Sequence, residues 1–411
     1  MIEIRPFKGF RPKEGLEGKI ACKPYDVITY DEALEEGRDN PLSFLHIIRS
    51  EIDLPLDTDP YSQQVYDKAK ENLEEFLSKG YLIEEEKRNF YIYRQIMDGR
   101  IQDGLVACAS IDDYARGTIK RHELTRVDKE EDRVNHFYTV GGNTEPVFLF
   151  HKKNGDIKAF IKDWIENHQP VYDFSSQDGV RQVLWIVDDE GAQAELVKLF
   201  KSLDSLYIAD GHHRTASAYK VGLKKREENP KYTGGEEFNY FLSVIFSEDE
   251  LYIMPYNRLV KDLNGYRQEE FLERVKEKFV VEALKELEEP KKKGQFTLAF
   301  KDKAYKLIPR DGTYKQDDPI ESLDPSILQN NILGPILGIE DPRTSHRIDF
   351  VGGVGMLDKI KAGLEEDKVA FLLYPTDIGD IIRVSDEGKI MPPKSTWFEP
   401  KLMSGLFIHK F

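Results

Sequence analysis

Residues 206–214 read Leu-Tyr-Ile-Ala-Asp-Gly-His-His-Arg, and the fold prediction starts from this stretch. Leu206–Ile208 is apolar enough to end a buried strand, and Asp210-Gly211 is a typical turn pair. Thr215–Lys220 can continue as a helix, for which Asp210 would be the N-cap. The sequence therefore predicts a strand that turns at a glycine into a helix.

This predicted turn has the features of a phosphate-binding site. The first N–H groups of a helix lack partners within the helix, so they can bind an anion. Arg214 adds a planar guanidinium that pairs with two phosphate oxygens at once and stays charged at any working pH. We predict that Asp210, Gly211, His212, His213 and Arg214 form a phosphate pocket. The competing interpretation is an ordinary Asp-Gly turn, with histidines that cap a helix or lie at the surface.

Length and composition limit the classes of protein to consider. A chain of 411 residues exceeds the size at which one core usually stops growing, so we expect two domains. No stretch approaches the eighteen or so consecutive apolar residues of a membrane span, and the first residues lack a secretion signal, so we expect a cytoplasmic protein without a membrane partner. The net charge of −16 opposes binding to nucleic acid. Composition does not indicate an oligomeric state.

Hydrophobic periodicity predicts strands that alternate with helices, which indicates an α/β or α+β arrangement. We expect helices over residues 62–80, 111–136, 157–165 and 269–279. We expect strands over residues 91–93, 105–109, 147–150, 183–187, 238–246, 296–300 and 305–308. The predicted domain boundary lies near residues 255–265.

The tail, residues 391–401, contains three prolines and two lysines, which predicts a stiff, extended segment. Lys394, Ser395 and Thr396 could donate several hydrogen bonds to phosphate or to a small polar ligand. A chain end that only packs over the core is the alternative, and both interpretations can hold together.

Several segments resemble a family of uncharacterised bacterial and archaeal proteins: Arg5–Phe7, Lys23–Ile28, Lys120–Arg133, Gly142–Pro146, Ala209–Arg214 and Pro392–Thr396. The middle segment is also similar to the ParB/sulfiredoxin-like superfamily, and most closely to its free serine kinase branch, whose pocket reads Asp-Gly-His-His-Arg. A Pro-Lys-Thr-Thr run of that kinase resembles Pro393–Thr396. Its Pro-His-Glu run, whose acid is the proposed base, would match Pro24-Tyr25-Asp26.

The resemblance implies an α+β fold with a ParB/sulfiredoxin-like mixed sheet and a second, smaller α/β domain. Residues 1–258 would form the nucleotide-binding catalytic domain. Residues 259–411 would form a C-terminal α+β domain whose tail, 391–401, returns to the active site. Sulfiredoxin chemistry is disfavoured because His212 stands where that enzyme has its cysteine.

The implied activity is transfer of phosphate from ATP or ADP to free L-serine or a similar small hydroxyl metabolite. Asp26 is the candidate general base, with His212 and Glu123 as alternatives and a local turn as the competing role. Asp210 would contact Mg²⁺. The resemblance adds Arg126 to the phosphate-binding residues and His122 to the substrate-binding residues Lys394, Ser395 and Thr396.

Two other classes of function remain open. The first is a nucleotide-binding regulatory switch without transfer activity. The second is a metal-dependent phosphohydrolase that uses the paired histidines, although adjacent helical residues point about 100° apart and suit a shared metal poorly.

Overall fold

The computed structural model describes residues 1–411, which divide into two compact units. Unit 1 comprises Met1–Arg121, Thr125–Leu251 and Pro400–Phe411. Unit 2 comprises His122–Leu124 and Tyr252–Glu399.

The boundaries of the two units do not coincide with the expected division of the chain after residue 258. The chain leaves unit 1 after Leu251 because the next residues form β13 (Tyr252–Met254), which pairs antiparallel with β20 (Trp397–Glu399) of the same unit. The chain returns to unit 1 at Pro400, in the last part of the predicted 391–401 tail.

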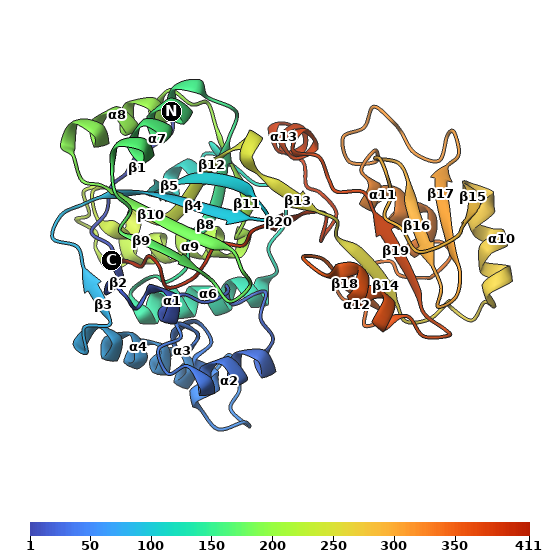
Figure 1. Ribbon diagram of the computed structural model, residues 1–411, viewed down its shortest axis with the longest axis horizontal. Coiled ribbons are helices and arrows are strands. Elements are labelled where there is room, and N and C mark those ends of the chain that lie inside the picture. The colour runs from blue at the N-terminus through green and yellow to red at the C-terminus, as the bar shows by residue number, and fades with distance from the viewer. The chain divides into compact units, whose positions relative to one another are not determined.

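Unit 1 is built on a nine-stranded mixed sheet with helices packed on it (Figure 1). The strand order is β6-β11-β8-β12-β5-β4-β10-β9, and β1 pairs with β5. The pairs β11–β6 and β12–β8 are parallel, and the other pairs are antiparallel. The strands are β1 (Ile4–Arg5), β4 (Phe90–Met97), β5 (Arg100–Ser110), β6 (Ile119–Lys120), β8 (Val147–His151), β9 (Tyr172–Ser175), β10 (Arg181–Val187), β11 (Leu206–Asp210) and β12 (Tyr240–Ser247).

Helices of unit 1 cover the sheet and form a separate small cluster near the N-terminus. They are α1 (Glu17–Ile20), α2 (Tyr30–Asp39), α3 (Leu45–Ile48), α4 (Gln63–Ser78), α5 (Ile111–Ala115), α6 (Val127–Val140), α7 (Gly155–Asn167), α8 (Glu190–Lys201) and α9 (His212–Glu228). Two short pairs complete the unit: β2 (Phe10–Pro12) with β3 (Leu82–Glu84), and β7 (Gly142–Asn143) with β21 (His409–Lys410). The predicted mixed sheet with helices is thus confirmed for this unit.

The sheet is buried on both faces. Alternate strand residues such as Ile92, Leu149 and Ile208 form one core cluster with side chains of α6 to α9. On the other face, Phe407 of the returning tail packs against Tyr91 and Tyr93, with ring centroids 5.4 and 5.8 Å apart. Burial of both faces explains why the central strands read as continuous apolar runs rather than alternating ones.

The prediction of one helix over residues 111–136 is wrong. The segment forms α5, then β6, and then the start of α6. Gly117 adopts φ +73°, a left-handed conformation that ends α5, and Ile119 then pairs with Leu206 of β11. The charged residues of this segment resembled a helix surface, but the glycine and the β-branched residues after it decide the local structure.

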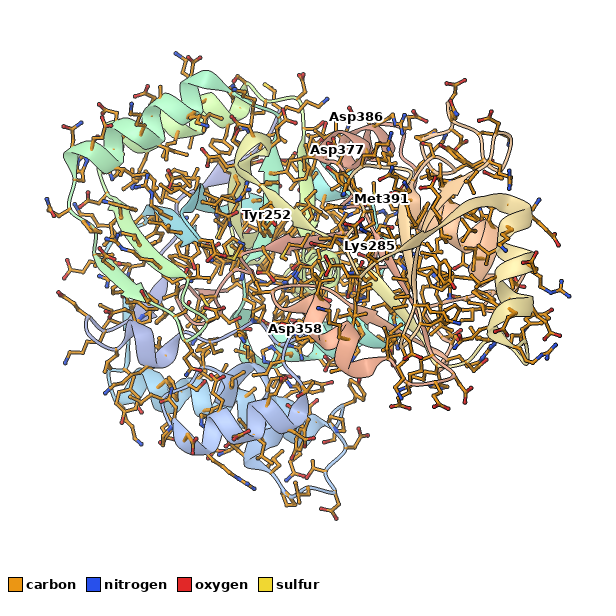
Figure 2. The ribbon with its side chains drawn as sticks, turned by 45° about the vertical axis from the view of Figure 1, so that its right-hand side comes forward. Tyr252, Lys285, Asp358, Asp377, Asp386 and Met391 are labelled. Carbon is orange, nitrogen blue, oxygen red and sulfur yellow. The ribbon has the colours of Figure 1, made fainter.

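Unit 2 contains a six-stranded, fully antiparallel sheet in the order β15-β17-β16-β19-β14-β18. The strands are β14 (Asn257–Val260), β15 (Phe279–Leu284), β16 (Phe296–Ala299), β17 (Ala304–Pro309), β18 (Ile348–Val351) and β19 (Val369–Leu373). The helices are α10 (Gln268–Lys278), α11 (Asp324–Leu328), α12 (Met356–Gly363) and α13 (Ile378–Asp386). Figure 2 shows α13 between its N-cap, Asp377, and its last residue, Asp386.

No helix in the chain has both the length and the apolar character that crossing a membrane requires.

Candidate functional site

The predicted strand-turn-helix unit is confirmed, but its cap differs from the prediction. Strand β11 ends at Asp210, and Gly211, not Asp210, is the N-cap of α9. Gly211 adopts φ +90°, which glycine accepts at low cost. The Asp210 side chain instead accepts the N–H of Gly211 on Oδ1 at 2.8 Å. A Cβ atom on Gly211 would lie 3.1 Å from Nε and 3.2 Å from Cζ of Arg214, so the glycine also lets the guanidinium lie against the turn.

Arg214 is the central cation of this site. Its side chain is only 3% exposed, and Nη1 donates to the carbonyl oxygen of Pro146 at 2.5 Å. Nη2 lies 3.7 Å from Oδ2 of Asp26 and 3.9 Å from Oδ2 of Asp210, and Nε has no hydrogen-bond partner. Burial opposes the charge of Arg214, but Asp26 and Asp210 outweigh it and raise the pKa. A buried guanidinium with an unused N–H is suited to bind an oxyanion.

Asp210 has a second basic partner that the sequence analysis missed. Nζ of Lys401 donates to Oδ2 of Asp210 at 3.0 Å. The backbone carbonyl of Lys401 accepts the side-chain N–H of Gln95 at 2.9 Å. Gln95 is fully buried and also accepts from Gln102 at 2.8 Å. The only sequence signal for Lys401 was its place as the second lysine of the proline-rich tail.

The pKa of Asp210 reflects these neighbours. Burial would raise the pKa, but Lys401 and then Arg214 outweigh burial and lower the pKa below its usual range. The carboxylate is therefore ionised at neutral pH, and each of its oxygens already accepts a hydrogen bond.

A buried group of charged and polar residues holds the segment that carries Asp26. Oε1 of Glu145 accepts the N–H of Tyr25 and the hydroxyl of Ser404, both at 3.1 Å. The guanidinium of Arg133 lies over the Tyr25 ring at 4.1 Å and places Nη1 3.7 Å from Oε2 of Glu145. Burial raises the pKa of Glu145, against the opposing effect of Arg214 and Arg133. The sequence marked the segments of Arg133 and Glu145 only as family signatures, without roles.

The two histidines of the motif have different surroundings. Nε2 of His213 accepts the backbone N–H of Arg126, the N-cap of α6, at 3.0 Å. His212 is buried at the first turn of α9. The side chain of Arg126 is 55% exposed and pairs with Asp128 at 2.7 Å. The motif thus contacts the backbone of Arg126 and not its guanidinium.

The predicted substrate-binding residues lie in unit 2. Nε2 of His122 lies 3.4 Å from the hydroxyl of Thr396, and the His122 carbonyl accepts the N–H of Met391 at 2.8 Å. The Ser395 hydroxyl donates to the Pro392 carbonyl at 2.6 Å. The structure therefore brings His122 together with the 391–396 segment, and separately brings Asp26 together with the Asp210–Arg214 motif in unit 1.

No cluster of three or more His, Cys, Asp or Glu side chains is placed to hold a metal ion. A metal that contacts Asp210 would compete with Lys401 for Oδ2.

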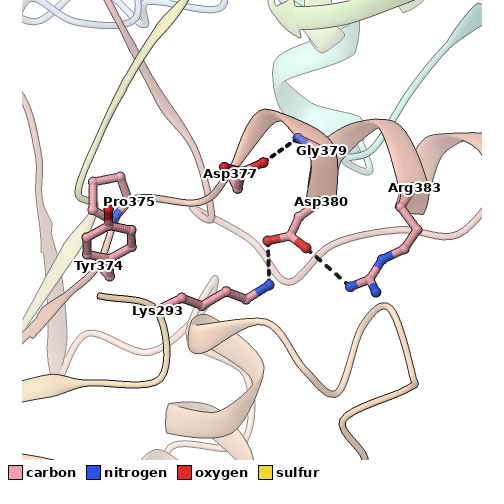
Figure 3. A pocket seen from close by; sticks show the side chains of 7 residues that line it. All are labelled: Lys293, Tyr374, Pro375, Asp377, Gly379, Asp380 and Arg383. Atoms are coloured by element: carbon pink, nitrogen blue, oxygen red, sulfur yellow. Dashed lines mark hydrogen bonds and ion pairs between the residues drawn. The ribbon is translucent and has the colours of Figure 1, made fainter. Parts of the chain in front are cut away.

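Several cavities lie away from the motif, and two of them are the larger ones. One in unit 1, of about 520 Å³, is lined by α7 residues such as Ile161 and by the C-terminal end of β12. The other, in unit 2, has a volume of about 380 Å³ (Figure 3). It is lined in part by Asp380, which pairs with Lys293 at 2.6 Å and with Arg383 at 3.2 Å, so these acidic and basic groups neutralise one another.

The chain belongs to the family described as "Protein of unknown function (DUF1015)", whose model matches residues 4–326. The predicted membership of an uncharacterised family is thus confirmed. No curated protein matches the sequence.

Three solved structures show weak similarity to this chain. A free serine kinase in complex with AMP has 16% identity and a TM-score of 0.38, and the match covers 74% of this chain and 92% of that one. SbnI with a C-terminal truncation from Staphylococcus aureus has 10% identity and a TM-score of 0.39, with coverages of 73% and 85%. A conserved hypothetical protein from Pyrococcus furiosus has 16% identity and a TM-score of 0.35, with coverages of 74% and 95%. Values this low do not assign a function.

Proposed function

We propose that this protein is a nucleotide-dependent phosphotransferase that phosphorylates free L-serine or a similar small hydroxyl metabolite. The main support is the position of the Asp26 carboxylate, 3.7 Å from the buried guanidinium of Arg214. A candidate base and a candidate phosphate-binding group, from distant parts of the sequence, thus lie side by side. The Asp-Gly-His-His-Arg run, which the sequence shares with free serine kinase, supports the same reaction class.

Phosphoryl transfer requires a held phosphate and an acceptor hydroxyl aligned with it, and little covalent chemistry from the protein. In this proposal the N-terminal N–H groups of α9 and the unused Nε of Arg214 hold phosphate oxygens. Lys401, beside Asp210, supplies further positive charge. Asp26 is 35% exposed, so an acceptor hydroxyl can reach it and lose its proton there.

ATP or ADP would be the phosphate donor, and Mg²⁺, when bound, would neutralise phosphate charge. Because the chain forms no metal cluster of its own, we propose that the ion arrives with the nucleotide and that Asp210 is its nearest protein carboxylate. Lys394, Ser395 and Thr396 stay candidates for acceptor binding. The support for this role is their place in a run similar to that of the kinase.

Transfer of labelled phosphate tests the proposal directly. Purified protein is incubated with Mg²⁺, γ-labelled ATP or β-labelled ADP, and either L-serine or a pool of small hydroxyl metabolites. A labelled phosphate ester in the presence of acceptor supports the phosphotransferase. Tight nucleotide binding without any product would favour a regulatory switch, and metal-dependent release of inorganic phosphate without acceptor would favour a phosphohydrolase.

A further inference from the structure

Arg258 is a buried arginine without a carboxylate partner. It lies in β14 of unit 2, and only 3% of the residue is exposed. Its guanidinium donates to two backbone carbonyl oxygens, that of Tyr256 and, at 3.2 Å, that of Lys394. Arg347 of the same unit, by contrast, pairs with Asp262.

A buried cation without a counter-ion is costly, because carbonyl dipoles replace only part of the hydration that the ion loses. Burial lowers the pKa of Arg258 to about 10, and Tyr256 is the one group that acts in the opposite direction. The guanidinium therefore stays charged at neutral pH. Its positive charge is not neutralised by any carboxylate of the protein.

Arg258 lines a cavity of about 290 Å³ that several prolines also line. Prolines from three segments contribute to the lining: Pro325, Pro342, Pro392 and Pro393. Proline has a fixed φ, so these four residues lose little backbone entropy when a ligand binds. The volume suits a small metabolite or an inorganic ion.

The backbone beside the cavity is held in an uncommon conformation. Lys394 adopts φ +57°, which is sparsely populated by residues other than glycine, and its carbonyl faces Arg258. The Ser395 hydroxyl fixes this turn by donating to Pro392, and the Thr376 hydroxyl donates to the Ser395 carbonyl at 2.7 Å. Strained residues that are held by several hydrogen bonds concentrate at ligand sites.

The acidic groups at the cavity do not neutralise Arg258. Asp341 is engaged with Arg343 through hydrogen bonds of 2.7 and 2.9 Å, and Glu340 is exposed and makes no ion pair with Arg258. From this arrangement we infer that the cavity binds a small oxyanion, a carboxylate or a phosphate group, that pairs with the guanidinium of Arg258. The inference concerns unit 2 alone and does not depend on the proposed function.

Anion titrations test this site. Isothermal titration calorimetry on the full-length wild type, at constant ionic strength and without nucleotide, uses inorganic phosphate in one arm and acetate in the other. We expect binding in at least one arm, and the arm that binds identifies the preferred oxyanion. Arg258→Lys keeps the positive charge but loses the planar guanidinium, which can donate two parallel hydrogen bonds to one oxyanion. This variant should bind the anion at least tenfold more weakly. The matched control Arg347→Lys should bind within twofold of wild type.

A second test, should Arg258→Lys fold poorly, uses Arg214→Lys, which removes the other buried arginine proposed to bind phosphate. With ¹⁵N-labelled arginine, addition of inorganic phosphate or acetate to this variant should still shift one buried side-chain N–H signal and leave the signals of surface arginines in place. Binding by neither anion at 10 mM would overturn the inference, and so would unchanged affinity in folded Arg258→Lys.

Discussion

Oδ2 of Asp26 lies 3.7 Å from Nη2 of Arg214, and this pair connects the N-terminal segment with the Asp-Gly-His-His-Arg motif. Asp26 also lies in the turn that follows Pro24, so it is a turn residue as well as a neighbour of Arg214. Tyr25 is fixed by Glu145 and Arg133, and the position of Asp26 is therefore determined by buried contacts rather than by its own surface loop.

Asp26→Asn should slow proton removal and spare nucleotide binding. We expect turnover to fall by about 10²- to 10⁴-fold, the usual contribution of a general base. Nucleotide affinity should stay equal or improve slightly, because a negative charge near the phosphates is lost. Turnover and equilibrium affinity are measured on the same preparation, and full turnover in the variant would exclude Asp26 as the base.

Gly211→Ala should disturb both the turn and the guanidinium. A non-glycine residue at φ +90° costs about 1 to 2 kcal/mol, and the new Cβ would meet Arg214 at 3.1 Å. The control is Gly117→Ala, at φ +73° with no atom within 4 Å of the added Cβ. Both variants should lower the free energy of unfolding in urea, Gly211→Ala at least as much as Gly117→Ala, but only Gly211→Ala should weaken nucleotide binding. Equal nucleotide affinity in the two variants would show that the turn at Gly211 takes no part in nucleotide binding.

Lys401→Met should destabilise unit 1 through Asp210. The pair is mostly buried, with side chains 16% and 26% exposed, so its loss should cost about 1 to 3 kcal/mol, less than for a fully buried pair. A double-mutant cycle with Asp210→Asn, followed by urea unfolding, measures the coupling between them. Coupling below about 0.5 kcal/mol would mean that Lys401 does not stabilise the ionised carboxylate.

Asp324→Asn should change how stability depends on pH. Burial raises the pKa of Asp324 to about 7, with opposing effects from the Gly294 N–H and Lys293 and a further increase from Asp380. In the unfolded chain the carboxyl titrates near 3.8. Between about pH 4 and 7 the native state thus keeps a proton that the unfolded state has lost, and the free energy of unfolding decreases as pH rises.

The asparagine variant removes this dependence and keeps an oxygen that can accept the N–H of Gly294. The difference in free energy of unfolding, variant minus wild type, should increase by about 2 to 4 kcal/mol from pH 4.5 to pH 8. Urea unfolding followed by tryptophan emission measures it. If the free energy of unfolding changed with pH in the same way for both proteins, Asp324 would be ionised in the native state across this range.

The parts of the fold that depend on local pattern were predictable. Hydrophobic periodicity over residues 62–80 predicted α4, and the apolar run, the Asp210-Gly211 turn and the segment after it predicted β11 and α9; the structure confirms these elements. The 111–136 segment failed because Gly117 ends the first helix, and ion-pair spacing alone carries no information about such a break.

For the candidate site, the sequence predicted the local structure of the Asp-Gly-His-His-Arg motif but not the long-range partners of its residues. Resemblance led to Asp26 and local chemistry led to Arg214, and the structure places them side by side. Lys401 reaches Asp210 only because the chain returns to unit 1 at Pro400, and Glu145 acts through the backbone of Tyr25. Contacts of this kind depend on tertiary structure, which a single sequence does not encode as a local pattern.

The most direct test of the central claim is nucleotide binding at the Arg214 site. Titration calorimetry with Mg²⁺ and ATP or ADP compares wild type, Arg214→Lys, and the control Arg226→Lys, whose guanidinium pairs with Asp112 near the other end of α9. We predict binding by wild type and by Arg226→Lys, and at least tenfold weaker binding by folded Arg214→Lys, because a lysine cannot reproduce the bidentate contact. The absence of binding to wild type, or equal affinity in all three proteins, would contradict the account.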